Sequence, residues 1–385
     1  MNYLDKLLQG AEVELLSLGE VAELKRGTTI TANTKTDGNI PVISGGQKPA
    51  YYNGEYNRDG ETITVSGSGA YAGFVMYWNE PIFVSDAFSI KADESKVLPR
   101  YIYHFLLNIQ DKIHDLKSGG GVPHVYAKDV ARFQISIPPL EVQKEIVRIL
   151  DTFTELTAEL TAELTARKQQ YEHYRDKLLN FNNLNGGGYK RLTMSELGIF
   201  QRGKRFVKDD MISEGVPCIH YGEMYTYYGT WAKESKSFLS EELVERKNLR
   251  IAENGDVVIV AAGETIEDIG LGTAWLGEEG VVIHDACFSY RSTLNPKFVA
   301  YFTRTKQFHD QIKKHISSGK ISAINARGLE KVLIPVPSPE EQERIVTILD
   351  KFDILTSSIS EGLPKEIELR KKQYEYYRDK LLAFK

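Results

Sequence analysis

Basic, hydroxyl and aromatic side chains occur together in short glycine-containing segments. These side chains are the ones in the sequence that could bind a ligand. Glycine lets a backbone approach a phosphate closely, and arginine can form two hydrogen bonds with a guanine edge. DNA contact is the chemistry that such segments favour, although a solvated loop explains any single basic residue equally well, and packing is the better interpretation of the tyrosines. The candidate contact residues are Lys25, Arg26, Thr28, Tyr51, Tyr52, Ser118, Gly119, Arg202, Lys204, Arg205, Lys313, Lys314, Ser318 and Lys320.

Motifs for catalysis are missing from the sequence. It has no Gly-x4-Gly-Lys-Ser/Thr phosphate loop, no His-Glu-x-x-His zinc motif and no Asn/Asp-Pro-Pro-Tyr/Phe segment of amino-methyltransferases. Residues 67–72 fit a dinucleotide-binding glycine pattern, but a strand-like segment follows them, so we expect a hairpin turn. His220 and His284 lie in apolar surroundings and are expected to be satisfied core residues. We predict no catalytic residue on this chain.

Cysteine usage and charge narrow the class of protein further. The two cysteines, Cys218 and Cys287, are too few for a disulfide framework or a zinc site. Residues 1–134 carry 13 Lys and Arg against 16 Asp and Glu, and residues 184–333 carry 20 against 19. Neither segment is strongly basic, so DNA affinity would have to come from local patches and from partner subunits. No signal peptide or membrane-span pattern occurs, and we expect a cytoplasmic protein with no membrane partner.

The elements that position these residues come from an internal duplication. The segment Tyr171–Phe181 returns as Tyr374–Phe384, and residues 1–12 contain a shorter echo of this helix tail. Ile146–Phe153 likewise matches Ile345–Phe352. Ser118-Gly119 is aligned with Ser318-Gly319, but the stretches between the helical segments match faintly. Two similar domains joined by two similar helices can form a pseudo-twofold object, whose natural partner repeats in space as DNA does.

Both repeated helical stretches carry an apolar heptad seam, which is the signature of a coiled coil. The first stretch also contains the tetrapeptide repeat Leu-Thr-Ala-Glu from Leu156 onward. In the second stretch, Ser338 is placed to cap the helix, and a four-residue insertion with Gly362 and Pro364 predicts a kink or short break. The seam residues are Ile146, Leu150, Phe153, Leu160, Leu164, Tyr171, Tyr174, Leu178, Ile345, Leu349, Phe352, Tyr374, Tyr377 and Leu381.

The sequence predicts an α+β protein with two globular, mixed α/β domains separated by two long antiparallel helices. The first domain covers residues 1–134, with strand-like runs at 61–65, 74–78 and 81–84 and helical periodicity over 99–117. The second covers residues 184–333, where 256–260, 280–284 and 296–316 correspond to these. The helical stretches are 135–183 and 334–385, and Gly186–Gly188 predicts a flexible hinge.

These residues resemble the specificity subunits of type I restriction–modification systems, over the whole chain. The strongest marks are residues 137–151 and 337–350, each followed later by Tyr-x-x-Tyr-Arg-Asp-Lys-Leu-Leu. The Leu-Thr-Ala-Glu repeat also looks like the central spacer of some members. The resemblance implies that both globular domains are target recognition domains, each recognising one half of a bipartite, asymmetric double-stranded DNA sequence, while the helices set the spacing.

The resemblance also implies the partners. Two methyltransferase subunits would hold S-adenosylmethionine, and two restriction/translocase subunits would use ATP and Mg²⁺ in the full complex. This chain would hold no cofactor. The alternative is a coiled-coil scaffold, without DNA, that presents two β-rich domains to other proteins; a fused nuclease or methyltransferase is disfavoured by the missing motifs. Exchanging residues 1–134 with a relative separates these alternatives, because only DNA recognition predicts a change in one half-site.

Overall fold

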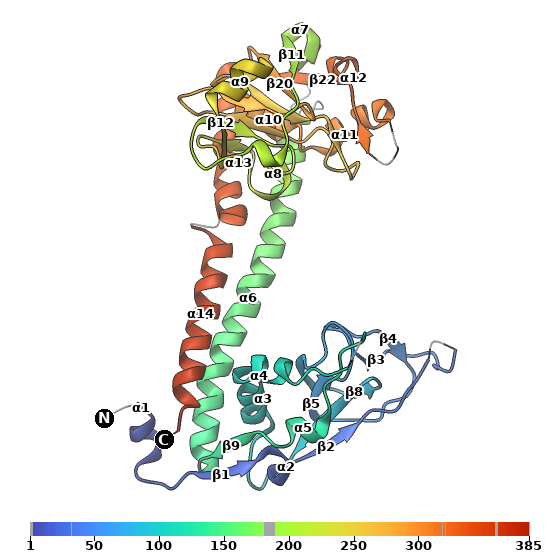
Figure 1. Ribbon diagram of the computed structural model, residues 1–385, viewed down its shortest axis with the longest axis vertical. Coiled ribbons are helices and arrows are strands. Elements are labelled where there is room, and N and C mark those ends of the chain that lie inside the picture. The colour runs from blue at the N-terminus through green and yellow to red at the C-terminus, as the bar shows by residue number, and fades with distance from the viewer. Residues whose placement is uncertain are drawn as a thin grey trace. The chain divides into compact units, whose positions relative to one another are not determined.

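The computed structural model describes residues 3–31, 33–119, 121–180, 189–317, 319, 321–358 and 361–384. The predicted hinge at Gly186–Gly188 lies outside this set. The chain forms two compact units. The first unit comprises residues 1–160 with 367–385, and the second comprises residues 161–366. Each unit therefore contains one globular domain together with part of both helical stretches (Figure 1).

Two sheets and a two-stranded ribbon form the first domain. The order β2-β8-β5-β6 gives an antiparallel four-stranded sheet, and β4-β3-β7 gives a three-stranded sheet in which β3 and β7 run parallel. The ribbon pairs β1 with β9 immediately before the long helix begins. The strands are β1 (Glu14–Ser17), β2 (Ala22–Arg26), β3 (Ile40–Ile43), β4 (Tyr51–Asn53), β5 (Glu61–Ser66), β6 (Val75–Asn79), β7 (Phe83–Val84), β8 (Ala87–Ala92) and β9 (Gln134–Ile137).

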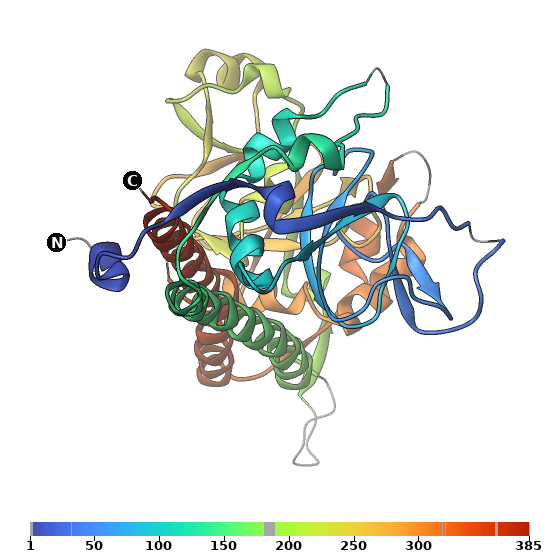
Figure 2. The same cartoon turned by 90° about the horizontal axis from the view of Figure 1, so that it is seen from below.

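Helices of the first unit cover the sheet and join it to the long helix α6. Figure 1 shows α3 between the strands and α6. Figures 1 and 2 place α1 beside the C-terminal end of α14, and Leu4 and Leu381 belong to the same buried cluster as Ile146 and Leu150. The helices are α1 (Tyr3–Leu8), α2 (Leu18–Val21), α3 (Pro99–Asn108), α4 (Gln110–Asp115), α5 (Ala127–Val130), α6 (Leu140–Leu178) and α14 (Leu363–Leu381).

The second domain repeats this plan with additions. A five-stranded sheet has the order β11-β20-β16-β18-β13, a four-stranded sheet has the order β14-β12-β19-β15, and ribbons pair β10 with β22 and β17 with β21. The strands are β10 (Lys190–Thr193), β11 (Gly198–Arg202), β12 (Val216–Ile219), β13 (Trp231–Ala232), β14 (Ser237–Leu239), β15 (Ile251–Ala252), β16 (Val257–Val260), β17 (Ala262–Gly263), β18 (Gly272–Trp275), β19 (Val281–Ile283), β20 (Cys287–Ser292), β21 (Ser322–Ala323) and β22 (Leu333–Val336).

Several helices of the second unit occur at positions of the repeat that match helices of the first unit. The α10–α11 pair corresponds to α3 and α4, and α13 corresponds to the start of α6. The helices are α7 (Met194–Leu197), η1 (Lys208–Asp210), α8 (Glu223–Thr226), α9 (Glu241–Lys247), α10 (Pro296–Phe302), α11 (Lys306–Ile312), η2 (Lys313–His315), α12 (Ala326–Glu330) and α13 (Pro339–Ser357).

The duplication extends to local capping chemistry. Ser17 and Glu20 form a capping box at α2, and Thr193 and Glu196 form the same box at α7. Ser338 caps α13, as the sequence predicts, because its hydroxyl accepts a hydrogen bond from the Glu341 amide. These short-range bonds satisfy helix N-termini that would otherwise leave amide groups unpaired.

Seam residues of the two helical stretches meet in each unit, with the helices antiparallel. In the first unit the ring of Phe153 stacks on Tyr377, with centroids 5.2 Å apart. In the second, Phe352 stacks on Tyr171 and on Tyr174, at 6.2 and 5.7 Å. The remaining seam positions of the first stretch, including Leu160 and Leu164, lie within the continuous helix α6.

The second helical stretch is interrupted where the four-residue insertion falls. Helix α13 ends at Ser357 and α14 begins at Leu363. Gly362 has a φ of +87°, and a Cβ at this position would lie 2.5 Å from the Ile354 carbonyl oxygen. The predicted break is confirmed, and glycine is the residue that permits it.

Candidate nucleic-acid interface

An Arg-Gly pair ends the first strand of the main sheet in both domains. Arg26 is the last residue of β2 and Arg202 is the last residue of β11. A Cβ on Gly27 would lie 2.3 Å from the Ser85 carbonyl oxygen, and a Cβ on Gly203 would lie 2.2 Å from that of His284. Only glycine fits so close to a neighbouring backbone. These glycines therefore serve packing within the fold, whereas the sequence suggested an approach to phosphate.

In the second domain the loop after Gly203 borders a pocket of about 630 Å³, hereafter the second-domain pocket. Aromatic and imidazole rings form much of its wall, because the centroids of His220 and His284 lie 4.7 Å apart and that of Tyr221 lies 4.6 Å from His220. Phe206 packs edge-on against His284 at 5.2 Å. The charged residues that line this pocket are Arg202, Arg205, Lys208, Glu264 and Asp285.

Burial favours the neutral form of both histidines of the second-domain pocket. Burial lowers the pKa of His220 and of His284, and nearby acidic groups offset this effect only in part. The Nδ1 atom of His220 accepts a hydrogen bond from the Gly222 amide, and the Nδ1 atom of His284 accepts one from the Ala286 amide. A neutral imidazole that accepts at Nδ1 carries its proton on Nε2, as His220 does. The Nδ1 atom of His284 also lies 3.0 Å from the Asp285 Oδ1 atom.

The corresponding place in the first domain is nearly closed. The first-domain pocket has a volume of about 50 Å³ and is lined by Arg26, Asp86, His124 and Tyr126, among others. The Ser68 hydroxyl donates a hydrogen bond to the Asp86 carboxylate. The rings of His124 and Tyr126 stack with centroids 6.1 Å apart. Arg26 and Asp86 match Arg202 and Asp285. The two domains therefore share these two residues at their pockets, while the shapes of the pockets differ.

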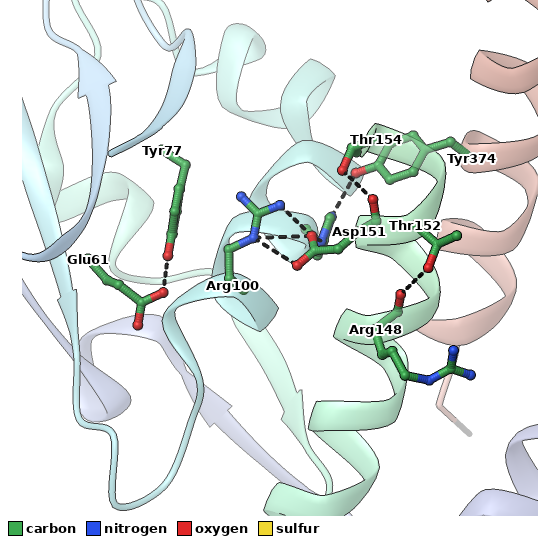
Figure 3. Close-up of polar contacts among 9 residues, drawn as sticks. Glu61, Tyr77, Arg100, Arg148, Asp151, Thr152, Thr154 and Tyr374 are labelled. Atoms are coloured by element: carbon green, nitrogen blue, oxygen red, sulfur yellow. Dashed lines mark hydrogen bonds and ion pairs between the residues drawn. The ribbon is translucent and has the colours of Figure 1, made fainter. Parts of the chain in front are cut away.

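A second repeated feature joins each domain to its long helix. In the first unit, the Asp151 carboxylate on α6 accepts hydrogen bonds from Arg100 and from His104 Nε2 on α3, the latter at 2.8 Å. The Tyr374 hydroxyl on α14 donates to His104 Nδ1 at 2.9 Å. We name these four residues the first anchor. Figure 3 shows Arg100 facing Asp151, with Tyr374 approaching from the neighbouring helix.

Charge and burial reinforce the first anchor. Burial would raise the pKa of Asp151, but hydrogen bonds from His104 and Arg100 outweigh this effect and hold that pKa below its usual value. Burial lowers the pKa of His104, whose side chain is 0% exposed. Arg100 also lies over the Tyr77 ring, 4.5 Å from its centroid, and the Tyr77 hydroxyl donates to Glu61. The contacts therefore run from the sheet through α3 to both long helices (Figure 3).

The second anchor occupies the matching positions in the second unit. Asp350 on α13 accepts hydrogen bonds from Lys297 and from the Tyr301 hydroxyl on α10, both at 2.7 Å. Lys297 also lies 4.1 Å from the centroid of the Trp231 ring. Gln143 and Gln342 complete the correspondence, because each accepts from the amide before its proline-initiated helix, Leu98 in one unit and Asn295 in the other.

Comparison with known proteins decides the family. The model of the type I restriction modification DNA specificity domain matches residues 11–167 and again residues 181–369. A putative type I restriction enzyme specificity subunit of Haemophilus influenzae is 32% identical over 400 residues, covering 100% of this chain and 98% of that protein. This chain belongs to the type I specificity-subunit family.

A further curated relative and two solved structures agree with this assignment. The specificity subunit of the Escherichia coli enzyme EcoR124I/EcoR124II is 33% identical over 410 residues, covering 100% of this chain and 97% of that subunit. The type I system S subunit of M. genitalium is 17% identical with a TM-score of 0.59, over 100% of both chains. A chain from a study of type I complex assembly and conformational transition is 17% identical with a TM-score of 0.61, over 97% and 98%. These structures support the specificity-subunit fold.

Several candidate contact residues predicted for this specificity-family chain lie on exposed surface around the two pockets. Arg26 and Arg202 line them directly, Arg205 lines the second, and Ser118 pairs with His124 of the first. Lys25 and Thr28 flank Arg26, Gly119 follows Ser118, and Lys204 follows Gly203. Tyr52 is exposed, whereas the Tyr51 hydroxyl donates to the Ile30 carbonyl; both belong to β4 of the other sheet.

The remaining candidates are less closely associated with a pocket. Lys313 and Lys314 are exposed in η2, and Ser318 and Lys320 lie outside the described residues. The bridge partner corresponding to Ser118 is Ser317, since the pairs are Ser118 with His124 and Ser317 with Ala323. Both bridged pairs are six residues apart, so the alignment of Ser118 with Ser318 is off by one residue.

Sequence reasoning missed the rings of the second-domain pocket. His220 and His284 were expected in the core, yet both are half-buried and line the pocket with Tyr221. Their apolar neighbours are buried strand residues of β12 and β19, while the histidines sit just past the strand ends. A polar ring directly after a strand was the available signal.

Among the described residues, no group of three metal-ligating side chains forms and no helix has the length and apolarity to cross a membrane.

Proposed function

We propose that this chain is the DNA sequence-recognition subunit of a type I restriction–modification complex and performs no catalysis itself. Each globular domain recognises one half of a bipartite, asymmetric target. The observation that carries this proposal is the contrast between the pockets, which share Arg26/Arg202 and Asp86/Asp285 but have volumes of about 50 and 630 Å³. Two domains with the same fold and differently shaped pockets are suited to recognising different base sequences.

Exposed apolar side chains on the helices support a second role, the docking of methyltransferase subunits. Tyr376, Tyr377 and Leu369 on α14 are about half exposed, as is Ile354 on α13. Large exposed apolar residues grouped on a helix mark a surface for another protein. In the proposed complex, two methyltransferase subunits bring S-adenosylmethionine, and two restriction/translocase subunits bring ATP and Mg²⁺. Partner subunits would also supply phosphate contacts that this acidic chain offers sparsely.

The test is an exchange of residues 1–134 for the corresponding domain of a relative with a different target. The complex with the hybrid chain should methylate a sequence in which one half-site is new and the other is unchanged. The reciprocal exchange of residues 184–333 is the matched control and should change the other half alone. Sequencing of methylated positions across a genome measures both. An unchanged target in both hybrids would contradict DNA recognition and favour the protein-binding scaffold.

The helical repeat in α6 allows a separate test of spacing. Removing Leu160–Glu163 deletes one tetrapeptide, which shortens an α-helix by roughly 6 Å while nearly preserving its face. We expect the gap between half-sites to shorten while both half-sites keep their sequences. An unaltered gap in the methylated sequence would rule out the helix as a ruler.

A further inference from the structure

The walls of the second-domain pocket suit a flat aromatic ligand. The rings of His220, Tyr221 and His284 meet there with centroids 4.6–5.2 Å apart, and the buried Phe206 packs behind them. Aromatic and imidazole faces are the surfaces on which proteins stack nucleobases. The volume of about 630 Å³ falls within the range of roughly 300–1,000 Å³ that ligand pockets usually span.

Polar groups in the same pocket match the edge of a base. Because His220 accepts at Nδ1, its Nε2 carries a proton, and no described residue accepts a hydrogen bond from it. Glu264 and Asp285 line the pocket with carboxylate oxygens, which accept hydrogen bonds from amino groups; the Oδ1 atom of Asp285 also lies 3.0 Å from His284 Nδ1. One donor together with two carboxylate acceptors complements a base that carries both an amino group and a ring acceptor.

Basic side chains lie at the rim of the second-domain pocket, where the phosphate of a bound nucleotide would lie. Arg202, Arg205 and Lys208 line the pocket and are exposed to solvent. The Nε atom of Arg202 donates to the Asp285 carbonyl at 2.9 Å, which fixes the guanidinium beside the pocket. Guanidinium and ammonium groups at such a rim are the usual partners of nucleic-acid phosphates.

The first domain provides an internal comparison. At the matching place, Asp86 is engaged by Ser68, and the rings of His124 and Tyr126 leave about 50 Å³. That volume is too small for a base. The feature therefore belongs to one repeat and does not follow from the shared fold.

We infer that the second-domain pocket binds a single nucleotide, with its base among the rings and its phosphate at the basic rim. The nucleotide comes from one of two sources: it is everted from the DNA half-site that this domain recognises, or it is a free nucleotide. The assignment rests on the proposed function and adds a ligand to one of its two domains. Eversion costs unstacking, and stacking inside the pocket offsets that cost.

The first arm of the test uses fluorescent bases that brighten when unstacked. The full chain, in complex with its methyltransferase subunits, is mixed with duplexes carrying 2-aminopurine or pyrrolocytosine at each position of the target in turn. We expect a bright position in the half-site of the second domain, in addition to any base everted by the methyltransferases. No pocket-dependent bright position is expected in the other half-site.

Two pocket variants and one matched control tie this signal to the pocket. Val207 lines it, and its side chain is 44% exposed, so Val207→Trp fills the space without disturbing the core. Val207→Thr is the matched control of nearly equal volume. Val207→Trp should abolish the pocket-dependent signal and weaken duplex binding about tenfold, whereas Val207→Thr should retain both. His220→Phe keeps a ring but loses the donor, and should reduce duplex affinity about threefold.

The second arm titrates deoxynucleoside monophosphates and ATP into the same complex without DNA, followed by calorimetry. Saturable binding that Val207→Trp removes, with no pocket-dependent bright base in the duplex, identifies a free nucleotide as the ligand. Duplex signals identical in wild type and Val207→Trp, together with no nucleotide binding, would overturn the assignment. The proposed function would survive that result, because domain exchange tests it independently through the methylated sequence.

Discussion

The two repeats hold their domains to the long helices with the same geometry and different side chains. Asp151 accepts from Arg100 and His104, and Asp350 accepts from Lys297 and Tyr301. In both repeats the two donors are four residues apart, one helical turn, on a helix that starts with proline. What the repeats share is an acceptor on the long helix and two donors opposite it. The donor side chains differ between the two repeats.

Among the described residues, the first anchor alone has a hydrogen bond to a third helix. The Tyr374 hydroxyl on α14 binds His104, whereas Tyr171, at the corresponding position of α6, stacks on Phe352 of α13. His104 can bind both Asp151 and Tyr374 because a neutral imidazole has one donor and one acceptor nitrogen. The residue at the matching position of the second unit is Tyr301, which has a single hydroxyl group. His104 on α3 therefore connects the first domain to both α6 and α14.

The largest effect is expected from removing the anchor aspartates. Asp151→Ala leaves the buried His104 and the charged Arg100 without their acceptor and should destabilise the first unit by about 2–3 kcal/mol. Asp350→Ala should cost the second unit about 1–2 kcal/mol, because Lys297 keeps its contact with Trp231. Hydrogen exchange of peptides from α3 and α10 in the full chain measures each loss separately. Equal losses in both units would show that the two anchors stabilise their units equally.

The interruption between α13 and α14 should be the next most sensitive place. Gly362→Ala forces a side chain into a φ of +87° and against the Ile354 carbonyl, and should cost about 2 kcal/mol. The control lies in the uninterrupted helix of the other repeat, where Glu163→Ala should change stability by less than about 0.5 kcal/mol. Urea unfolding of the full chain compares the two variants. A neutral Gly362→Ala would show that the break does not need glycine.

Removing single hydroxyl groups sharpens the comparison of the third-helix contacts. Tyr374→Phe leaves His104 Nδ1 unpaired in a buried site and should cost about 1–2 kcal/mol. Tyr171→Phe, the matched change in the second unit, should cost about 0.5 kcal/mol because its ring stacking on Phe352 remains. Thermal unfolding of both variants provides the measurement. A larger loss for Tyr171→Phe would reverse the assignment of the coupling contact.

The smallest expected effect is a dependence on pH that only the first anchor shows. Burial lowers the pKa of His104, so the unfolded chain binds the proton more readily than the folded one. The contribution is fully present above the usual histidine pKa of about 6.5 and declines as the pH falls through it. His104→Phe should therefore make exchange from α3 less dependent on pH between about 7.5 and 5.5. Tyr301→Phe should leave the pH dependence of exchange from α10 unchanged, since a buried tyrosine does not titrate in this range.

Local patterns account for the parts of the fold that the sequence predicts. The expected strands at 61–65, 74–78 and 256–260 appear as β5, β6 and β16, because β-branched and aromatic runs bounded by turn residues specify strands locally. The cap at Ser338 and the break at Gly362 follow from single residue types in the same way. The role of His104 was not predicted, because its partners Asp151 and Tyr374 are distant in the sequence.

The sequence by itself determined that the chain is a duplication, that each repeat ends in an amphipathic helix, and that the two helical stretches differ by an insertion. These features are encoded by periodicity and identity between nearby or repeated segments. Only the tertiary structure decided that described residues of the second domain surround a pocket of about 630 Å³, whereas those at the matching place in the first domain surround about 50 Å³. Arg202, His220, Gly263 and His284 lie at or just after the ends of four strands in three different sheets, β11, β12 with β19, and β17, and only the packing of these sheets in the folded domain brings them together.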